Sequence, residues 1–220
     1  MLYHTRYLTL TDIDIILELQ SKVVQALDST ATLQPLSAEE FTTILSEDKL
    51  MIGMFDEERL ISFRALLIPK LDDPYGHLGL DVGIPENELS KVIYSEVSVV
   101  DPDYRGKRLQ TQMGLYLFER IDTEKFYHVC ATVAPHNIPS LLDKLMLGME
   151  IRALKEKYSG KLRYILYKDL RKKDESISTE DVTLVDLEDI DAQQKMLNEG
   201  FAGALFIKDA GKLSIGYRKL

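Results

Sequence analysis

The fold is decided by the stretch Tyr94-Ser-Glu-Val-Ser-Val-Val-Asp-Pro-Asp-Tyr-Arg-Gly-Lys-Arg-Leu-Gln110. This pattern is typical of a strand, a turn closed at Arg105-Gly106, and a helix that continues through residues 111–121. The first amides of a helix have no partner within it, and the helix dipole adds partial positive charge at the same end. The turn therefore predicts a site for a phosphate group, such as that of a cofactor.

The two common nucleotide motifs do not occur in the sequence. There is no G-x-G-x-x-G after a strand and no G-x-x-x-x-G-K-[ST] anywhere. Those motifs cradle phosphates through glycine-rich turns. Chemistry based on pyridine dinucleotides or on a Walker-type loop is therefore unsupported.

Residues 99–110 resemble the acyl-CoA-binding motif of the GNAT N-acyltransferase superfamily, which reads [Q/R]-x-x-G-x-[G/A] after a strand ending in Val-x-Pro. Arg105 takes the first position of that motif. Arg108 stands where the family has its key glycine, and Gln110 stands where it has glycine or alanine. Because Gly106 keeps the turn flexible, we expect the fold to match the family better than the details of phosphate contact.

A second resemblance follows the predicted strand His128–Val133. The family's later motif reads N-x-x-[AS]-x-x-L-Y-x-x-x-G-F, and Asn137, Ser140 and Gly148 fall at its offsets. Met149 replaces the phenylalanine. Two patterns in the correct order and spacing are stronger than either alone, and the resemblance covers roughly residues 2–169.

The resemblance implies a mixed α/β (α+β) fold, with a mostly antiparallel sheet flanked by helices. In that fold the strands that match residues 94–100 and 128–133 splay apart, and the pantetheine arm of acetyl-CoA enters the gap. Backbone groups of Ser98, Val99 and Val100 would line the arm. The pyrophosphate would be wrapped by the turn and the start of the helix, namely Arg105, Gly106, Lys107, Arg108, Leu109 and Gln110.

Three polar residues of these motifs have two interpretations each. Asn137 would contact the pantetheine arm or cap the helix that it precedes, and both roles can hold at once. Lys107 and Arg108 would add positive charge for the phosphates, or are ordinary exposed residues at a helix start.

Acyl transfer to an amine needs a base for the ammonium proton and a donor for the departing thiolate. Glu96 is the candidate base, because it lies on the cofactor strand between apolar neighbours that would raise the pKa of its carboxyl by desolvation. Strand alternation places Glu96 on the same face as Ser98, and a structural or ammonium-binding role is the alternative. Where the family most often has a tyrosine donor this chain has Lys144, for which a solvated helix lysine is the favoured interpretation.

Composition narrows the class of protein. With 220 residues, of which 45% are hydrophobic, the chain can bury a substantial core. Its formal charge of −9 argues against general affinity for nucleic acid. No stretch approaches the ~20 apolar residues of a membrane span, and the first residues lack a signal peptide's apolar region, so we expect a cytoplasmic protein. Cys130 is predicted to be a buried small hydrophobe, and the four histidines show no metal-ligand spacing.

The remaining pattern predicts helices and hairpins. Residues 3–10 predict an opening strand and residues 12–27 an amphipathic helix, while Ser37-Ala-Glu-Glu40 is a capping box. Residues 50–55 and 60–68, and likewise 150–157 and 161–167, read as hairpins. Residues 69–91 show little periodicity, and a lid and a surface excursion are equally supported.

The last fifty residues predict a separate extension. We expect a domain over residues 1–170, a charged linker over 171–181, and an extension over 182–220. The extension would hold a helix stopped by Gly200 and a hairpin of strands 201–207 and 212–217, in which Leu213, Ile215 and Tyr217 alternate. Because a two-stranded hairpin is marginal alone, its apolar face must lie on the domain or on a second chain, which makes a homodimer possible.

The function expected from the resemblance is transfer of an acetyl group from acetyl-CoA to a primary amine, without a metal. The acceptor, a small molecule or a peptide, is not readable from the sequence. The alternative is a catalytically weak module of the same fold that binds acyl-CoA or a partner. An unrelated mixed α/β binding protein would require both motif matches to be accidental.

Overall fold

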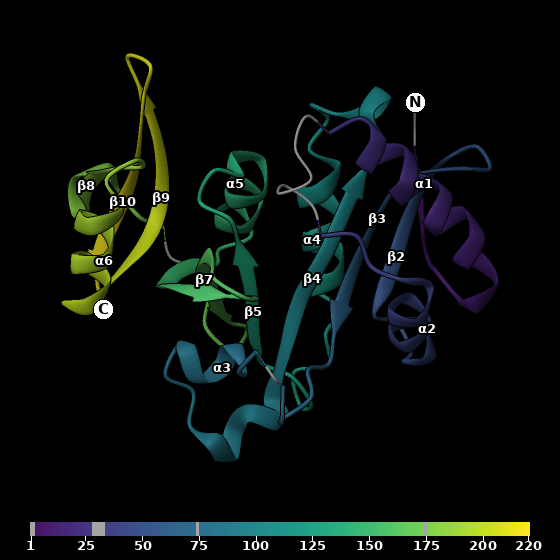
Figure 1. The fold of residues 1–220 in the computed structure, drawn as a ribbon, viewed down its shortest axis with the longest axis horizontal. Coiled ribbons are helices and arrows are strands. Elements are labelled where there is room, and N and C mark those ends of the chain that lie inside the picture. Colours follow the sequence, from purple (N-terminus) through teal and green to yellow (C-terminus); the bar gives the residue numbers. More distant parts are fainter. Residues whose placement is uncertain (1–2, 28–33, 74, 174–175) are drawn as a thin grey trace. The chain divides into compact units, whose positions relative to one another are not determined.

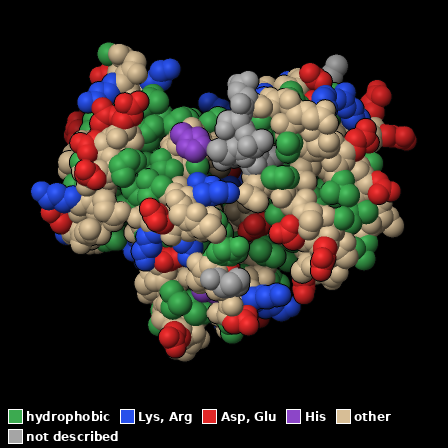
Figure 2. Space-filling model, in the orientation of Figure 1, with side chains coloured by type: hydrophobic (Ala, Val, Ile, Leu, Met, Phe, Trp, Pro, Cys, Tyr) green, Lys and Arg blue, Asp and Glu red, His purple; other side chains and the backbone are tan. Residues whose placement is uncertain are grey.

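A computed structural model describes residues 3–27, 34–73, 75–173 and 176–220 (Figure 1). The chain divides into two compact units, one formed by residues 1–68 and 94–121 and the other by residues 69–93 and 122–220. Within the described ranges, none of the helices has the length and apolar character that crossing a membrane requires. On the face shown in Figure 2, Lys and Arg side chains are interspersed with Asp and Glu.

The first unit contains an antiparallel sheet. Its strand order is β1-β2-β3-β4. The strands are β1 (His4–Tyr7), β2 (Met51–Asp56), β3 (Arg59–Leu67) and β4 (Val92–Val100), the last of which begins at the boundary between the units. The predicted hairpin over residues 50–68 is confirmed, and the opening strand is shorter than predicted.

Helices cover both faces of this sheet. They are α1 (Ile13–Gln25), α2 (Ala38–Ser46) and α4 (Leu109–Phe118) (Figure 1). The ring of Phe63 on β3 meets Phe41 of α2 edge-on at 5.7 Å, while its neighbours Ser62 and Arg64 contact α4. Since successive side chains of a strand point to opposite faces, α2 and α4 lie on opposite sides of the sheet.

The capping box at the start of α2 is confirmed. The Ser37 hydroxyl accepts a hydrogen bond from the Glu40 amide at 3.2 Å, and the Ser37 amide donates to the Glu40 carboxylate at 2.7 Å. This reciprocal pair satisfies two helix-end donors, which is why the short sequence signal was sufficient.

The second unit contains a longer antiparallel sheet of strand order β5-β7-β6-β9-β10-β8. The predicted hairpins over residues 150–167 and 201–217 are confirmed. The strands are β5 (His128–Val133), β6 (Glu150–Lys157), β7 (Lys161–Asp169), β8 (Thr183–Asp186), β9 (Phe201–Asp209) and β10 (Lys212–Lys219).

The helices of this unit are α3 (Leu78–Asp81), α5 (Ile138–Met146) and α6 (Ile190–Asn198). The expectation of little regular structure over residues 69–91 is corrected, because α3 and a 3₁₀ helix, Glu86–Lys91, occupy this segment. Helices of four and six residues are too short to show a helical period in sequence. Asp81 ties the segment to β6 by ion pairs with Lys155 at 2.9 Å and Lys157 at 2.8 Å.

The last strands belong to the same sheet as β6. Gly203 of β9 lies opposite Ile151 of β6, and a Cβ at residue 203 would stand 2.8 Å from the Ile215 side chain, so the strands pack closely there. The side-chain oxygen of buried Gln193 on α6 accepts hydrogen bonds from the Tyr164 and Tyr217 hydroxyls at 2.7 and 3.0 Å. The predicted ends of the domain at residue 170 and of the linker before residue 182 stay a prediction. Residues 174–175 of the linker fall outside the described residues.

Candidate functional site

The segment between β4 and α4 is a short ordered loop. After β4 come a 3₁₀ helix, Pro102–Tyr104, and an extended Arg105, and α4 starts only at Leu109. Gly106 has a left-handed backbone with φ 78°. An added Cβ at Gly106 would meet no atom within 4 Å among the described residues, so the glycine is favoured by backbone conformation and not by lack of space.

Arg108 is the second left-handed residue of this loop, with φ 57° and ψ 28°. It stands at the position where the sequence resemblance expects a glycine, and it holds the conformation that glycine favours. The Gln112 amide donates to the Arg108 carbonyl at 3.1 Å, and the Gln112 side chain donates to the Lys107 carbonyl at 3.1 Å. These hydrogen bonds attach the first turn of α4 to Lys107 and Arg108.

The loop presents its basic side chains to solvent. Arg105, Lys107 and Arg108 are all exposed. The Lys107 ammonium donates to the Tyr3 hydroxyl at 2.7 Å and lies 4.7 Å from the centre of the Tyr104 ring. Lys107 is therefore held against two tyrosines, which neither of its sequence interpretations anticipated.

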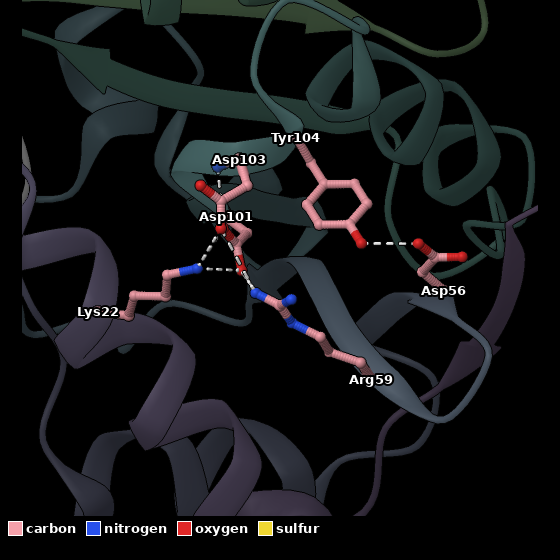
Figure 3. A network of polar contacts seen from close by, with 6 residues as sticks. All are labelled: Lys22, Asp56, Arg59, Asp101, Asp103 and Tyr104. Atoms are coloured by element: carbon pink, nitrogen blue, oxygen red, sulfur yellow. Dashed lines mark hydrogen bonds and ion pairs between the residues drawn. The ribbon is translucent and has the colours of Figure 1, made fainter.

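Asp101 anchors the start of the loop (Figure 3). Its carboxylate is 1% exposed and accepts hydrogen bonds from Lys22 Nζ at 2.7 and 2.9 Å and from Arg59 Nη2 at 2.5 Å. The Asp103 amide donates to the same carboxylate at 3.0 Å. Burial alone would raise the pKa of Asp101, but these hydrogen bonds outweigh it and the pKa is lowered.

A second buried residue holds the first turn of α4. Arg64, which is fully buried on β3, donates to the Gln110 carbonyl at 3.0 Å and to the Ser95 hydroxyl at 2.9 Å. Sequence reasoning missed both Arg64 and Asp101. The Asp-Pro-Asp run after the strand was a signal for Asp101, because aspartate commonly caps a short helix of this kind.

Strand β4 carries a bulge at Glu96. Leu66 of β3 lies opposite Ser95 and Ala65 lies opposite Val97, so Glu96 is the extra residue of a bulge in β4. The bulge interrupts the strand alternation from which Glu96 was placed on the same face as Ser98, so that placement stays a prediction. Glu96 is also exposed, which corrects the expectation of a desolvated carboxylate.

The other cofactor-strand residues are more enclosed. Val99 is buried, Ser98 and Val100 are partly buried, and the Ser98 hydroxyl oxygen is inaccessible to solvent. This oxygen has no hydrogen-bond partner among the residues that the structure describes.

Asn137 is the N-cap of α5, which is one of its two predicted roles. The Asn137 side chain accepts a hydrogen bond from the Ser140 amide at 3.2 Å, which is an N-cap contact. Lys144, in contrast, is not a solvated helix lysine. It is 5% exposed, and its ammonium lies 3.3 Å from the equally buried Asp143 carboxylate. The helix packs on strands and has little solvated surface at this position, which the sequence did not reveal.

Cys130 is fully buried on β5, as predicted, and desolvation raises the pKa of its thiol, which makes it a poor nucleophile. Over the described ranges, His, Cys, Asp and Glu side chains form no group of three that could hold a metal ion.

Comparison with known proteins identifies the fold. No family model matches the chain, and no curated protein matches it. A solved structure of a putative acetyltransferase, YncA, from Salmonella typhimurium with acetyl-CoA superposes with a TM-score of 0.58 at 11% identity, covering 81% of this chain and 99% of that one. The PaiA N-acetyltransferase from Thermoplasma acidophilum in complex with coenzyme A gives 0.54 at 14% identity, covering 77% and 99%.

The loading GNATL domain of CurA from Lyngbya majuscula gives a TM-score of 0.57 at 13% identity, covering 79% of this chain and all of that one. The chain therefore has the fold of the GNAT N-acetyltransferase superfamily, a mixed α/β fold with a mostly antiparallel sheet flanked by helices. The fold predicted from the two sequence motifs is confirmed.

Proposed function

We propose that this protein is an acetyl-CoA-dependent N-acyltransferase that acetylates a primary amine. The observation that carries the proposal is the backbone of Arg108. Arg108 stands where the sequence resemblance expects a glycine, and its backbone has the left-handed conformation that glycine favours. A site that binds through backbone amides depends on this loop conformation and not on the side chain at residue 108.

The residues present suit acetyl-CoA. The loop and the first amides of α4, over residues 105–110, would hold the pyrophosphate. Backbone groups of Ser98, Val99 and Val100 would line the pantetheine arm. Asn137 would contact the arm while capping α5. When bound, acetyl-CoA supplies an activated thioester.

The reaction requires a group on the protein that accepts a proton from the amine substrate. An amine attacks the thioester carbonyl as its neutral form, so the ammonium proton must first leave. Glu96 is the proposed acceptor of this proton or the group that binds the ammonium. Its exposure on a bulge suits both roles, because a bulge re-aims a side chain out of the regular strand pattern.

The second candidate is a catalytically weak module of the same fold that binds acyl-CoA. Two observations favour it. Glu96 is exposed, and Lys144 at the expected tyrosine position is buried beside Asp143. This candidate shares the cofactor site with the enzyme and differs in turnover.

Calorimetry with CoA and thiol release from acetyl-CoA across a panel of amines separate these candidates. An enzyme binds CoA at one site and releases thiol with at least one amine, whereas a silent module only binds. Absence of binding at millimolar CoA would reject both.

Substitution of Glu96 tests the proton role. Glu96→Gln is expected to lower kcat by about a hundredfold while CoA affinity changes little, because a base acts on the proton and not on the phosphates. Glu156→Gln is the matched control, since Glu156 is likewise an exposed glutamate on a strand. Wild-type turnover of the Glu96 variant from neutral to alkaline pH would exclude Glu96 as the base.

A further inference from the structure

We infer that Asp101, held by Lys22 and Arg59, is a positioning residue that orders the phosphate-binding loop before CoA arrives. The inference rests on the proposed function and adds to it residues outside the motif. All of the contacts that carry it lie within the first unit (Figure 3).

Asp101 organises the loop with both its backbone and its side chain. Its amide continues the ladder of β4 by donating to the Ile61 carbonyl at 2.9 Å. Its carbonyl accepts from the Tyr104 amide at 2.9 Å, and its carboxylate accepts from the Asp103 amide at 3.0 Å. A single residue therefore joins the end of the strand to the first turn of the loop.

Two cations from different elements fix this carboxylate. Lys22 comes from α1 and Arg59 from the start of β3, and both bind the Asp101 carboxylate. A buried carboxylate is costly unless it is paired and hydrogen-bonded, so the position of Asp101 depends on these partners. Lys22 also reaches Asp103 at 2.7 Å, which adds a second attachment in the loop.

The next residue of the loop is attached independently. The Tyr104 hydroxyl donates to the Asp56 carboxylate at the end of β2 at 2.6 Å, and the Arg59 guanidinium lies 5.6 Å from the centre of the Tyr104 ring. The loop is therefore attached through residues 101, 103 and 104. The exposed residues that follow, with their two left-handed backbones, begin from a fixed point.

Lys22 and Arg59 act through the loop and not as phosphate ligands, because their charged groups are engaged with Asp101. Ordering a binding loop in advance raises affinity by removing an entropy cost from the binding step. The inference therefore predicts an effect on CoA affinity without an effect on the chemical step.

The test uses the full chain with Lys22→Met and Arg59→Met, which remove half-exposed cations and leave the buried carboxylate in place. Each variant is expected to raise the Kd for CoA and the KM for acetyl-CoA about tenfold, because the loop must then order on binding, with kcat unchanged. The conservative variants Lys22→Arg and Arg59→Lys should recover most of the affinity. Calorimetric stoichiometry reports the folded fraction, so partial unfolding cannot imitate a rise in Kd.

Arg171→Met is the matched control. Arg171 is half-exposed and pairs with the buried Asp169 carboxylate at 2.7 Å, but lies in the other unit. The control should keep wild-type CoA affinity. An equal loss of affinity in the control, or wild-type affinity in both test variants, would overturn the inference while leaving the proposed function intact. Failure of the wild-type protein to bind CoA would overturn both.

Discussion

Arg108 holds a left-handed backbone at which glycine would meet no steric penalty from a Cβ. Its neighbours provide part of the explanation, because Gln112 bonds to the carbonyls of both Arg108 and Lys107. The loop conformation is thus maintained by the start of α4 and not by the residue type at 108. A mismatch at a motif's glycine need not change the backbone that the motif describes.

Arg108→Gly is expected to stabilise the protein by about 1 kcal/mol, because relief of the left-handed penalty exceeds the extra chain entropy of glycine in the unfolded state. CoA affinity should change less than threefold, roughly, since the amides remain and one exposed charge contributes little. Urea unfolding and calorimetry give the two quantities. A tenfold loss of CoA affinity would instead assign the guanidinium to the phosphates.

Gly106→Val places a β-branched residue at φ 78°. We expect a loss of about 1–2 kcal/mol in the free energy of unfolding and a larger loss of CoA affinity, because the loop amides shift when the backbone relaxes. Gly160→Val is a matched control, since Gly160 has φ 87° and an equally open surround but lies in the β6–β7 turn. If both variants bind CoA equally well, Gly106 has only a structural role.

At the scale of elements, what could be predicted from sequence depended on the strength of the local signal. The capping box at Ser37, the N-cap at Asn137 and the two-strand hairpins follow from local bonds and alternation, and all are confirmed. The bulge at Glu96 and the burial of Lys144 depend on which strand or helix lies opposite. No spacing along the chain encodes such contacts, so the roles of Glu96 and Lys144 were the least predictable.

The loop between β4 and α4 provides an acid-sensitive element. The pKa of Asp101 is lowered in the folded protein, so its ionised form contributes stability above the unfolded-state pKa of about 4. That contribution is lost as the pH falls through the lower, folded-state pKa. Asp101→Asn should cost about 2 kcal/mol at neutral pH through the loss of charge-assisted hydrogen bonds.

Thermal unfolding between pH 2 and 7 tests this prediction. The wild-type melting temperature should fall in acid more steeply than that of Asp101→Asn, and the two curves should converge at the lowest pH. Parallel curves would show that Asp101 does not titrate with folding. Asp169→Asn is a control for the acid response of a comparable buried pair, because the pKa of Asp169 is also lowered, mainly by its hydrogen bonds from Arg171.

At the scale of the whole molecule, the GNAT fold was predictable because two motifs lie at the correct separation in sequence. The end of the chain was harder to place. Its helix and hairpin were predicted from Gly200 and from the alternation of Leu213, Ile215 and Tyr217, and both elements are present. Which surface they cover could not be predicted, because a buried strand face does not identify its partner. The possible homodimer and the cytoplasmic location stay predictions.

The structure gives the last segment a role in the core of the second unit. Ile215 and Tyr217 are fully buried, and Gln193 accepts hydrogen bonds from the hydroxyls of Tyr217 and of Tyr164 on β7. Burial raises the pKa of Tyr164 to about 12, so its hydroxyl remains a donor at neutral pH. Removing the segment would expose the edge of β6 and leave the Tyr164 hydroxyl without this acceptor.

Truncation after Lys173 should therefore lower the melting temperature or cause aggregation without prior dissociation. A finer variant, Gln193→Leu, keeps the segment. It removes the acceptor shared by the two tyrosines and the hydrogen bonds that the Gln193 amide group donates to the Asp186 and Leu187 carbonyls, at a cost of roughly 1–3 kcal/mol for the unsatisfied groups. Light scattering and thermal unfolding of both variants separate the possibilities. A change from dimer to monomer on truncation would place the segment at a subunit interface. The truncated protein could instead stay soluble, keep its oligomeric state and have the melting temperature of the full-length protein. That result would show that the β6–β9 pairing contributes nothing to stability, and residues 182–220 would then be a dispensable tail.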